Sequence, residues 1–298
     1  MTSYKHDGKV GPWAREKLDC LQKYLKAYAT ILHKQEWCRG YFYVDAFAGS
    51  GRSDIRDYAK SETGESLIEL DEISNANAID QEYRDYVDGS PLVALRTEPA
   101  FTKCLFIEQN HQRANTLAAR CSSEFDSARY TIKTGDANQE LLALCRWHWN
   151  GYRAVAFVDP YAMQVEWSTV NAIARARAIE IIINLPMQTA VHRLLPREGA
   201  ISTQNANRLN RFFGTETWQS EFYSSERTLF GEVIRKNAPS SKLLEFYRRN
   251  LLNIFRYVSD ARIVRNTRGS PLYYLMHAGH NKTGQTIIND ILNQGEAI

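Results

Sequence analysis

The chain has 298 residues, of which 44% are hydrophobic, which is enough for one large domain with a sizeable core. Its net charge of +3 is too small to indicate a nucleic-acid partner by itself, and no apolar run approaches the roughly 20 residues that a membrane span needs. The five cysteines are scattered without a CxxC pair and the first residues lack the apolar core of a secretory signal, so we expect a cytoplasmic protein without disulfides or a zinc site.

The N-terminal part of the chain predicts a helix, a strand and a glycine-rich turn. Leu and Tyr recur on one face of an amphipathic helix over 15–32. An aromatic-rich apolar run over 41–47 predicts a buried strand that ends at Asp45, and a glycine-rich turn follows at once. From 52 to 90 there are eleven acids against four bases, so we predict an acidic inserted loop over 52–89. The string SPLVALRT (90–97) would then be the delayed helix of this first unit.

Short Val, Ile and Phe runs alternate with helical patterns through the middle of the chain. The helical patterns have apolar residues three to four apart and cover 111–125, 138–149 and 168–178. Because this alternation is typical of buried parallel strands joined by crossover helices, we expect an α/β sheet. The strands are expected over 103–110, 130–137, 153–161 and 178–186.

The C-terminal part has a different pattern. Helical spacing continues over 187–257, two β-rich runs within 261–279 predict an antiparallel hairpin, and a helix follows over 283–294. Between 193 and 268 fourteen bases oppose seven acids. This excess indicates either a basic surface for a polyanion or solvated helix faces. Lys242, Arg248 and Arg249 are the candidate phosphate contacts in this segment.

These elements together predict a single domain over 1–298. A mostly parallel α/β sheet that ends in an antiparallel hairpin resembles the Rossmann-like fold of class I S-adenosylmethionine (SAM) dependent methyltransferases. In that layout 52–89 is an insertion after the first glycine turn. The segment 187–257 is a helical insertion and a candidate target-recognition region.

The turn after the first strand disfavours two common nucleotide sites. A P-loop needs GxxxxGK[ST], and no such string occurs. A dinucleotide site needs a small residue at its third glycine position, where this chain has Asp54. SAM instead needs a carboxylate for its amine, glycines that let the backbone approach, and an acid for the ribose hydroxyls. An ordinary tight strand–helix connection is the alternative reading.

The predicted cofactor residues follow the ends of three strands. Asp45 would hold the SAM amine and Glu108 the ribose hydroxyls. The resemblance to SAM-dependent methyltransferases implies that Asp136 holds the adenine amino group. The D-x-F-x-G-x-G string that begins at Asp45 resembles motif I of nucleic-acid aminomethyltransferases. The full predicted set is Asp45, Phe47, Ala48, Gly49, Ser50, Gly51, Glu108, Asp136 and Ala137.

The end of the fourth strand carries the predicted catalytic residues Asp159, Pro160 and Tyr161. They resemble the (D/N)PP(Y/F) motif with which aminomethyltransferases hold a base amino group, although one proline of the pair is missing. The resemblance implies that Asp159 and a prolyl carbonyl orient the amine, and that Tyr161 stacks on a flipped-out base. A structural turn with a buried tyrosine is the alternative.

Several strings along the chain resemble the three-Cys-motif partner (TcmP) proteins. They are KYLKAYATIL, YFYVDAFAGSG, GSPLVAL, FIEQN, FVDPYAMQVEWSTVNAI, FFGTETW and PLYYLMHAGHNKTGQTI. Proteins of this bacterial family are described as methyltransferase-like and as genomic partners of a three-cysteine, radical-SAM-like protein. The resemblance therefore implies a SAM-site fold and a protein partner, but no particular substrate.

The leading prediction is a SAM-dependent methyltransferase that acts on a nitrogen of a DNA or RNA base. The alternatives are a partner protein that binds SAM or nucleic acid without catalysis, and a methyltransferase for a protein or small molecule. Other polar and aromatic residues receive no role in these predictions. His277 and His280 lack a third metal ligand nearby, Trp147 and Trp149 are expected to pack, and Gln164 is left unassigned.

Overall fold

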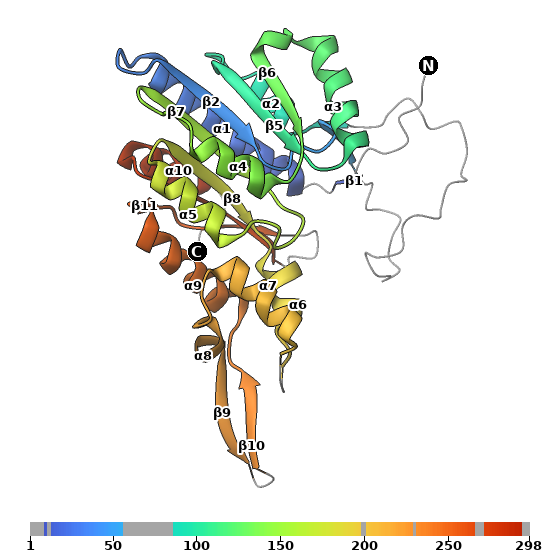
Figure 1. Cartoon of the computed structure of the whole chain (residues 1–298), viewed down its shortest axis with the longest axis vertical. Coiled ribbons are helices and arrows are strands. Elements are labelled where there is room, and N and C mark those ends of the chain that lie inside the picture. Colours follow the sequence, from blue (N-terminus) through green and yellow to red (C-terminus); the bar gives the residue numbers. More distant parts are fainter. Residues whose placement is uncertain are drawn as a thin grey trace, which may run out of the picture.

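The computed structural model describes residues 9–10, 13–55, 86–197, 201–228, 231–265 and 271–293. Its centre is an eight-stranded sheet with helices on both faces (Figure 1). Five strands run parallel to one another: β2 (Gly40–Asp45), β5 (Lys103–Glu108), β6 (Tyr130–Thr134), β7 (Tyr152–Val158) and β8 (Ile179–Leu185). All five were predicted, and each ends one to three residues early because polar or turn residues follow it.

The strand order is β11-β13-β8-β7-β2-β5-β6, with β12 paired to β13. β13 (Pro271–Gly279) runs antiparallel to β8, and β11 (Tyr257–Val258) and β12 (Arg262–Arg265) run antiparallel to β13. The predicted fold, a mostly parallel Rossmann-like sheet with a C-terminal antiparallel hairpin, is confirmed. The chain adds β5 and β6 on one side of β2 and then β7 and β8 on the other, so β2 and β7 flank the topological switch point.

Two sets of helices bury the two faces of the sheet. Successive side chains alternate between faces, so Tyr43 and Val44 of β2 belong to different cores. Helices α1 (Trp13–His33), α2 (Ser90–Leu95), α3 (His111–Glu124) and α10 (Lys282–Leu292) supply one core. Helices α4 (Ala137–Cys145), α5 (Trp167–Ala176) and α9 (Ser240–Ile254) supply the other. None of the described helices is long and apolar enough to cross a membrane.

Helix α4 ends four residues before the predicted boundary. The Arg146 amide bonds back to the Ala143 carbonyl in a tight last turn, and the chain then leaves the helix. Trp147 and Trp149 lie beyond this end with ring centroids 5.0 Å apart, and both rings meet Phe42 edge-on. These two rings therefore pack against the sheet, as predicted.

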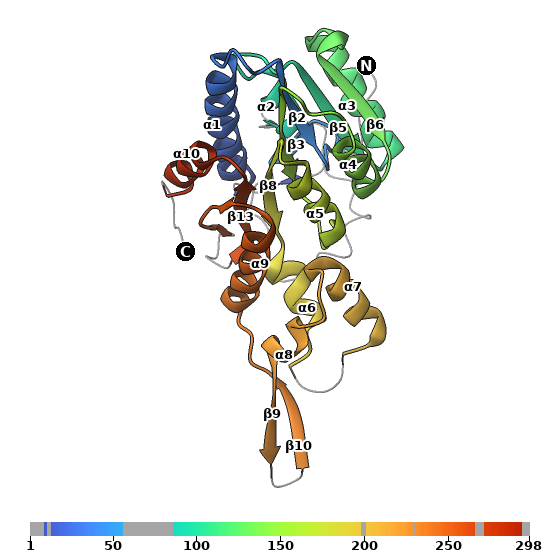
Figure 2. The same cartoon turned by 60° about the vertical axis from the view of Figure 1, so that its left-hand side comes forward.

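The insertion between β8 and β11 is only partly helical. It contains the π-helical turn η3 (Met187–Val191), α6 (His192–Leu194), α7 (Thr203–Phe213), α8 (Trp218–Phe222) and α9. Between α8 and α9 the strands β9 (Tyr223–Thr228) and β10 (Gly231–Lys236) form an antiparallel hairpin that projects from the body as an arm (Figure 2). Sequence analysis missed this arm because its strands bury no face against the sheet and so lack the apolar runs that mark the other strands.

The segment 52–89, the predicted acidic insertion, begins and ends in paired strands. β3 (Arg52–Ile55) pairs antiparallel with β4 (Tyr86–Asp88) and parallel with β1 (Lys9–Val10), while 56–85 lie outside the described residues. The Gly89 amide donates to the Gly51 carbonyl at 2.7 Å, so the insertion leaves and re-enters the domain at one point. Helix α2 starts at the next residue, as predicted for the delayed helix of the first unit.

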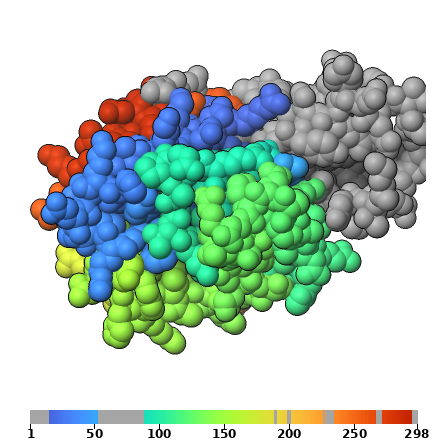
Figure 3. Space-filling view, turned by 90° about the horizontal axis from the view of Figure 1, so that it is seen from above, coloured from blue at the N-terminus to red at the C-terminus, as the bar shows by residue number. Residues whose placement is uncertain are grey.

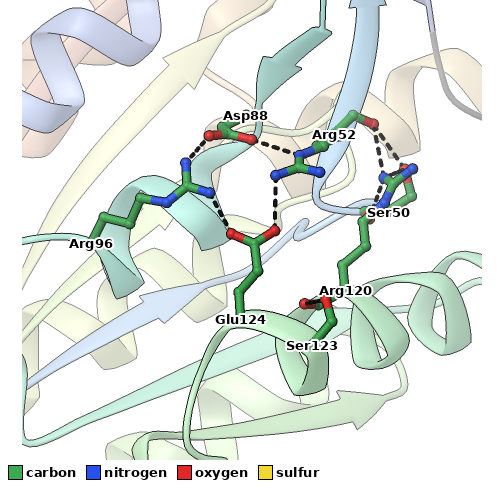
Figure 4. A network of polar contacts seen from close by, with 7 residues as sticks. All are labelled: Ser50, Arg52, Asp88, Arg96, Arg120, Ser123 and Glu124. Carbon is green, nitrogen blue, oxygen red and sulfur yellow. Dashed lines mark hydrogen bonds and ion pairs between the residues drawn. The ribbon is translucent and has the colours of Figure 1, made fainter.

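An ion-pair ring holds this entry point against α3. Arg52 and Arg96 each contact both Asp88 and Glu124, and Arg120 donates to the Ser50 carbonyl (Figure 4). The ring ties β3, β4, α2 and α3 together beside the glycine turn. The short helix η2 (Ser127–Arg129) leads from α3 into β6. Figure 3 shows this part of the chain, cyan to green, packed beside the blue N-terminal elements.

Candidate functional site

The switch point lies at the carboxyl ends of β2 and β7. The turn after β2 is held between its neighbours: the Ala46 amide donates to the Phe157 carbonyl at 3.0 Å, and the Ala48 amide to the Ile107 carbonyl at 2.9 Å. In open α/β sheets ligands bind in the crevice outside such strand ends. This edge of the sheet is therefore the first place to look for a site.

Asp45, predicted to hold the SAM amine, is completely buried beneath the turn. One carboxylate oxygen accepts from the Phe47 amide at 3.2 Å and the other from the Tyr43 hydroxyl at 2.9 Å. Burial raises the pKa of Asp45 to about 6, against the lowering effect of hydrogen bonds from Ser90 and Tyr43. In this arrangement Asp45 organises the glycine turn and does not line the cavity described below.

The glycine turn has an open outer surface. Gly49 has φ +63°, and a Cβ built on it would meet nothing within 4 Å, so a ligand can approach the backbone there. Gly51 has φ +86°, and its added Cβ would lie 2.9 Å from the Leu117 side chain. Ala48, before Gly49, and Ser50, between the two glycines, are buried, and the Ser50 hydroxyl donates to the Arg52 carbonyl at 3.0 Å.

Glu108, predicted to accept from the ribose, already has four donors. Its Oε2 accepts from the Gly49 amide at 2.9 Å, which ties the glycine turn to the end of β5. Its Oε1 accepts from the Asn110 amide at 2.7 Å and from Nε and Nη2 of Arg113 at 3.1 and 2.7 Å. Glu108 is only 4% exposed, so Arg113 occupies much of its accessible side.

A small cavity of about 40 Å³ opens at this edge. It brings together five of the predicted residues: Phe47, Glu108, Asp136, Ala137 and Tyr161. Asp136 caps α4, because its carboxylate accepts from the Gln139 amide at 3.0 Å. Ala46, Gln109, Arg113, Gly135, Asn138 and Gln164 complete the lining.

The loop after β7 is shaped by residues that sequence analysis left without a role. The Tyr161 amide donates to the Gln164 side chain at 3.1 Å, and the Asn138 amide group donates to the Gln164 carbonyl at 2.8 Å. Pro160 is buried, whereas Tyr161 is 75% exposed, with the Arg113 guanidinium 5.7 Å from its ring centroid. An exposed ring above the strand ends is available for stacking on a planar ligand.

Asp159 lies in a polar cluster with residues from α1 and β8. Its Oδ1 accepts from the Asn184 amide group at 2.7 Å, and its Oδ2 pairs with the Lys17 ammonium. Lys17 also lies 5.5 Å from the centroid of the Tyr273 ring. Each carboxylate oxygen has a second lone pair, so Asp159 retains acceptor capacity toward a target amine.

Sequence reasoning missed Lys17, Asn184 and Arg113. Lys17 is 142 residues from Asp159 and lies on an amphipathic helix, where a lysine is ordinarily a solvated residue. Asn184 interrupts the apolar run of β8, and this buried polar residue at a strand end was the one available signal. Arg113 lies on the first turn of α3, where nothing in the pattern distinguishes it.

The three predicted phosphate contacts on α9 have partners within the chain. Arg248 donates to the Ser259 carbonyl and pairs with Asp260 at 3.6 Å. Arg249 pairs with Glu221 at 2.6 Å, and Lys242 donates to the Asn237 side chain at 3.1 Å. These contacts join α9 to neighbouring elements, so the geometry gives all three residues a structural role.

The side chains at the switch point have the chemistry that SAM needs, but the cavity between them is smaller than a SAM site. Glu108 and Asp136 at two neighbouring strand ends, an open glycine turn and an exposed ring suit a cation-bearing ligand with a ribose and a planar base. The cavity volume is well below the roughly 300 Å³ at which small-molecule sites begin. Arg113 and Tyr161 both line this cavity, with the Arg113 guanidinium 5.7 Å from the centroid of the Tyr161 ring.

No family model matches the chain, and no curated protein matches it. Among solved structures, it is similar to a Legionella pneumophila protein assigned to family model DUF519, with 17% identity over 93% of this chain and 99% of that chain, and a TM-score of 0.43. It is also similar to Trm1 from Pyrococcus horikoshii in complex with SAM, with 9% identity over 96% of this chain and 61% of that chain, and a TM-score of 0.47. Because both TM-scores are below 0.5, we draw no functional inference from these similarities.

Proposed function

We propose that the protein is a SAM-dependent methyltransferase that methylates a nitrogen of a nucleic-acid base. The observation that carries this proposal is the arrangement of the switch point. Phe47 of the turn after β2, Glu108 and Asp136 line one cavity, and the Asp159–Tyr161 loop borders the same cavity through Tyr161. Cofactor-type and target-type groups thus meet at the switch-point edge, where open α/β sheets bind ligands.

The residues of this site would act by binding and alignment. SAM, when bound, supplies a methyl group activated by its sulfonium charge. Asp159 would accept a hydrogen bond from the target amine and keep its nitrogen lone pair directed at the methyl carbon. Lys17 and Asn184 hold the Asp159 carboxylate from two sides, and Tyr161 would stack on the base.

A basic cluster near the arm supports a nucleic-acid target. Lys236 at the end of β10 donates to His192 Nε2 at 3.0 Å, and its backbone amide donates to the Arg197 carbonyl. Burial, and then the neighbouring Arg197 charge, lower the pKa of Lys236, and burial followed by Lys236 and Arg197 lowers the pKa of His192. The Lys236 and Arg197 charges, gathered beside His192, would attract an anion such as a phosphate.

We also propose membership of the TcmP family, supported by the motif strings that span most of the chain. A three-cysteine, radical-SAM-like partner protein stays a prediction of that resemblance. The assignment of 52–89 and 187–257 as insertions of a single domain is likewise a proposal, supported by the hydrogen bond between Gly89 and Gly51 at the first of them.

The experiment is transfer of a radiolabelled methyl group from SAM to RNA, DNA and protein substrates, with SAM affinity measured by calorimetry. Asp159→Asn is the test variant, since it keeps the shape of the side chain. We expect label in nucleic acid, a turnover at least about 100-fold lower in the variant, and SAM affinity within about twofold of wild type.

The other outcomes select between the alternatives. SAM binding without transfer to any substrate would favour a non-catalytic partner protein. Label in protein alone would overturn the nucleic-acid target. Separate titrations in which neither SAM nor S-adenosylhomocysteine binds would overturn the proposal as a whole.

A further inference from the structure

A larger cavity lies at the opposite edge of the sheet from the switch point. It has a volume of about 290 Å³ and lies between α1, α10 and the first residues of β7 and β8. This volume is near the lower end of the range for small-molecule sites, roughly 300–1,000 Å³. Its lining shares no residue with the switch-point site described above.

The rim of this cavity is basic. Arg153, Arg177 and Lys282 line it, and none of them forms an ion pair with a carboxylate in the described part of the chain. Arg177 ends α5 in a left-handed conformation with φ 55°, the one described non-glycine residue with positive φ. The rim therefore suits an anionic group.

The floor of the cavity presents a buried acceptor. Glu180 is 9% exposed and is the one carboxylate among the described lining residues. Its Oε2 accepts from the Tyr24 hydroxyl at 2.5 Å and lies 3.3 Å from His277 Nε2, which is also 3.1 Å from the Tyr24 oxygen. Burial, followed by the Glu180 charge, raises the pKa of Tyr24, so this hydroxyl remains a neutral donor. These contacts direct Glu180 through Oε2, and no donor within the described residues bonds to its Oε1.

Aromatic side chains form the wall between rim and floor. The Trp37 ring is 48% exposed and lies 4.5 Å from the Arg153 guanidinium carbon. Tyr28 also lines the cavity, and its hydroxyl is buried without a hydrogen-bond partner among the described atoms. A planar ligand placed here would contact aromatic rings and could satisfy this hydroxyl.

We propose that this cavity binds a nucleoside monophosphate. The phosphate would lie at the rim between Arg177 and Lys282, because guanidinium and ammonium groups bind phosphate strongly. The base would lie against Trp37 and Tyr28 and donate an N–H to Glu180 on the floor. A single ligand thus accounts for the unpaired cations, the exposed indole and the directed carboxylate. This proposal is independent of methyl transfer, since it uses the other edge of the sheet.

Calorimetric titration of the full-length protein tests it. The probes are AMP, GMP, CMP and UMP, with ribose 5-phosphate and inorganic phosphate as controls for the base. Arg177→Gly removes the guanidinium and suits the left-handed backbone, and Glu180→Gln removes the floor charge with the same shape. Arg175→Ala is the matched control, because Arg175 is an exposed arginine on the same helix that does not line the cavity.

We expect at least one nucleoside monophosphate to bind in the micromolar range. Arg177→Gly and Glu180→Gln should each weaken that binding by about tenfold or more, as expected for the loss of a charge-assisted hydrogen bond, while Arg175→Ala should leave it unchanged. Melting temperatures of all variants show whether each is folded. If Glu180→Gln is unfolded, the affinity of Arg177→Gly alone decides the test. Equal affinity for inorganic phosphate or ribose 5-phosphate, or binding that survives Arg177→Gly, would overturn the proposal.

Discussion

At the residue scale, the burial of Asp45 couples folding stability to pH. Burial raises its pKa from 3.8 to about 6, so the folded protein keeps a proton that the unfolded chain has released between these values. The stability that this retained proton contributes is fully present below about pH 4 and is lost as the pH rises through about 6. The Asp45→Asn variant cannot titrate there.

We therefore expect the free energy of unfolding of Asp45→Asn to rise relative to wild type between about pH 4 and pH 7, by up to about 3 kcal/mol. Urea unfolding curves at several pH values measure this difference. A constant difference across the range would contradict the buried, raised-pKa carboxyl.

Arg113 is the second residue with a direct consequence for the site. Its guanidinium occupies Glu108 Oε1 and lies over Tyr161, and it places a positive charge where a positively charged cofactor would bind. We expect Arg113→Ala to tighten SAM binding several-fold, because it frees the carboxylate and enlarges the cavity. Calorimetry measures the change, with Lys133→Ala, an exposed lysine on β6, as the charge control. Weaker binding in Arg113→Ala would instead mean that Arg113 holds Glu108 in its productive position.

At the scale of elements, the ion-pair ring joins the entry of the acidic insertion to α3. The hydrogen bond from Arg96, with help from Arg52, lowers the pKa of Glu124. A carboxylate with a lowered pKa stabilises the fold above its unfolded pKa, and this contribution is lost as the pH falls through the folded value. The ring side chains are about one-third exposed, so solvent screens each pair.

We expect Glu124→Gln to lower the free energy of unfolding by about 1 kcal/mol or less near pH 7, and the difference to shrink below about pH 4 and in high salt. Thermal melts at two pH values and two salt concentrations are sufficient. A loss that is the same at low pH would mean that packing of the side chain, and not its charge, holds the insertion.

At the scale of the whole molecule, the insertion that carries the arm extends the protein beyond the end of the sheet (Figure 2). The basic cluster of His192, Arg197 and Lys236 connects α6 to the arm. If this cluster contacts the phosphates of the target, the double variant Arg197→Ala/Lys236→Ala should weaken nucleic-acid binding and lower the slope of log affinity against log salt by about 2.

SAM affinity should not change in this double variant, because the cluster does not line the switch-point cavity. Filter binding over a range of salt concentrations measures the slope, with Lys34→Ala, an exposed lysine after α1, as control. An unchanged slope would mean that the target backbone contacts another surface.

The arrangement of the sheet was predictable because it is encoded in local patterns. Strands buried on both faces must be continuous apolar runs, and crossover helices must repeat every three to four residues, so each element could be recognised from its own residues. Asp45, Glu108 and Asp159 were recognisable for a similar reason, since a polar residue that ends an apolar run lies at the edge of the sheet. The helix predicted over 90–97, observed as α2, was likewise recognisable from its own residues.

Only the tertiary structure decided what those strand ends do. Asp45 turned out to be buried beneath the glycine turn, Glu108 to be paired with Arg113, and Asp159 to be paired with Lys17. The arm and the cavity around Glu180 have no sequence signature, because one hairpin lacks a buried face and the other site is assembled from distant elements. Local sequence determines each element and the order of strands, but contacts between residues far apart in the chain depend on how the finished elements pack, and no local pattern records that packing.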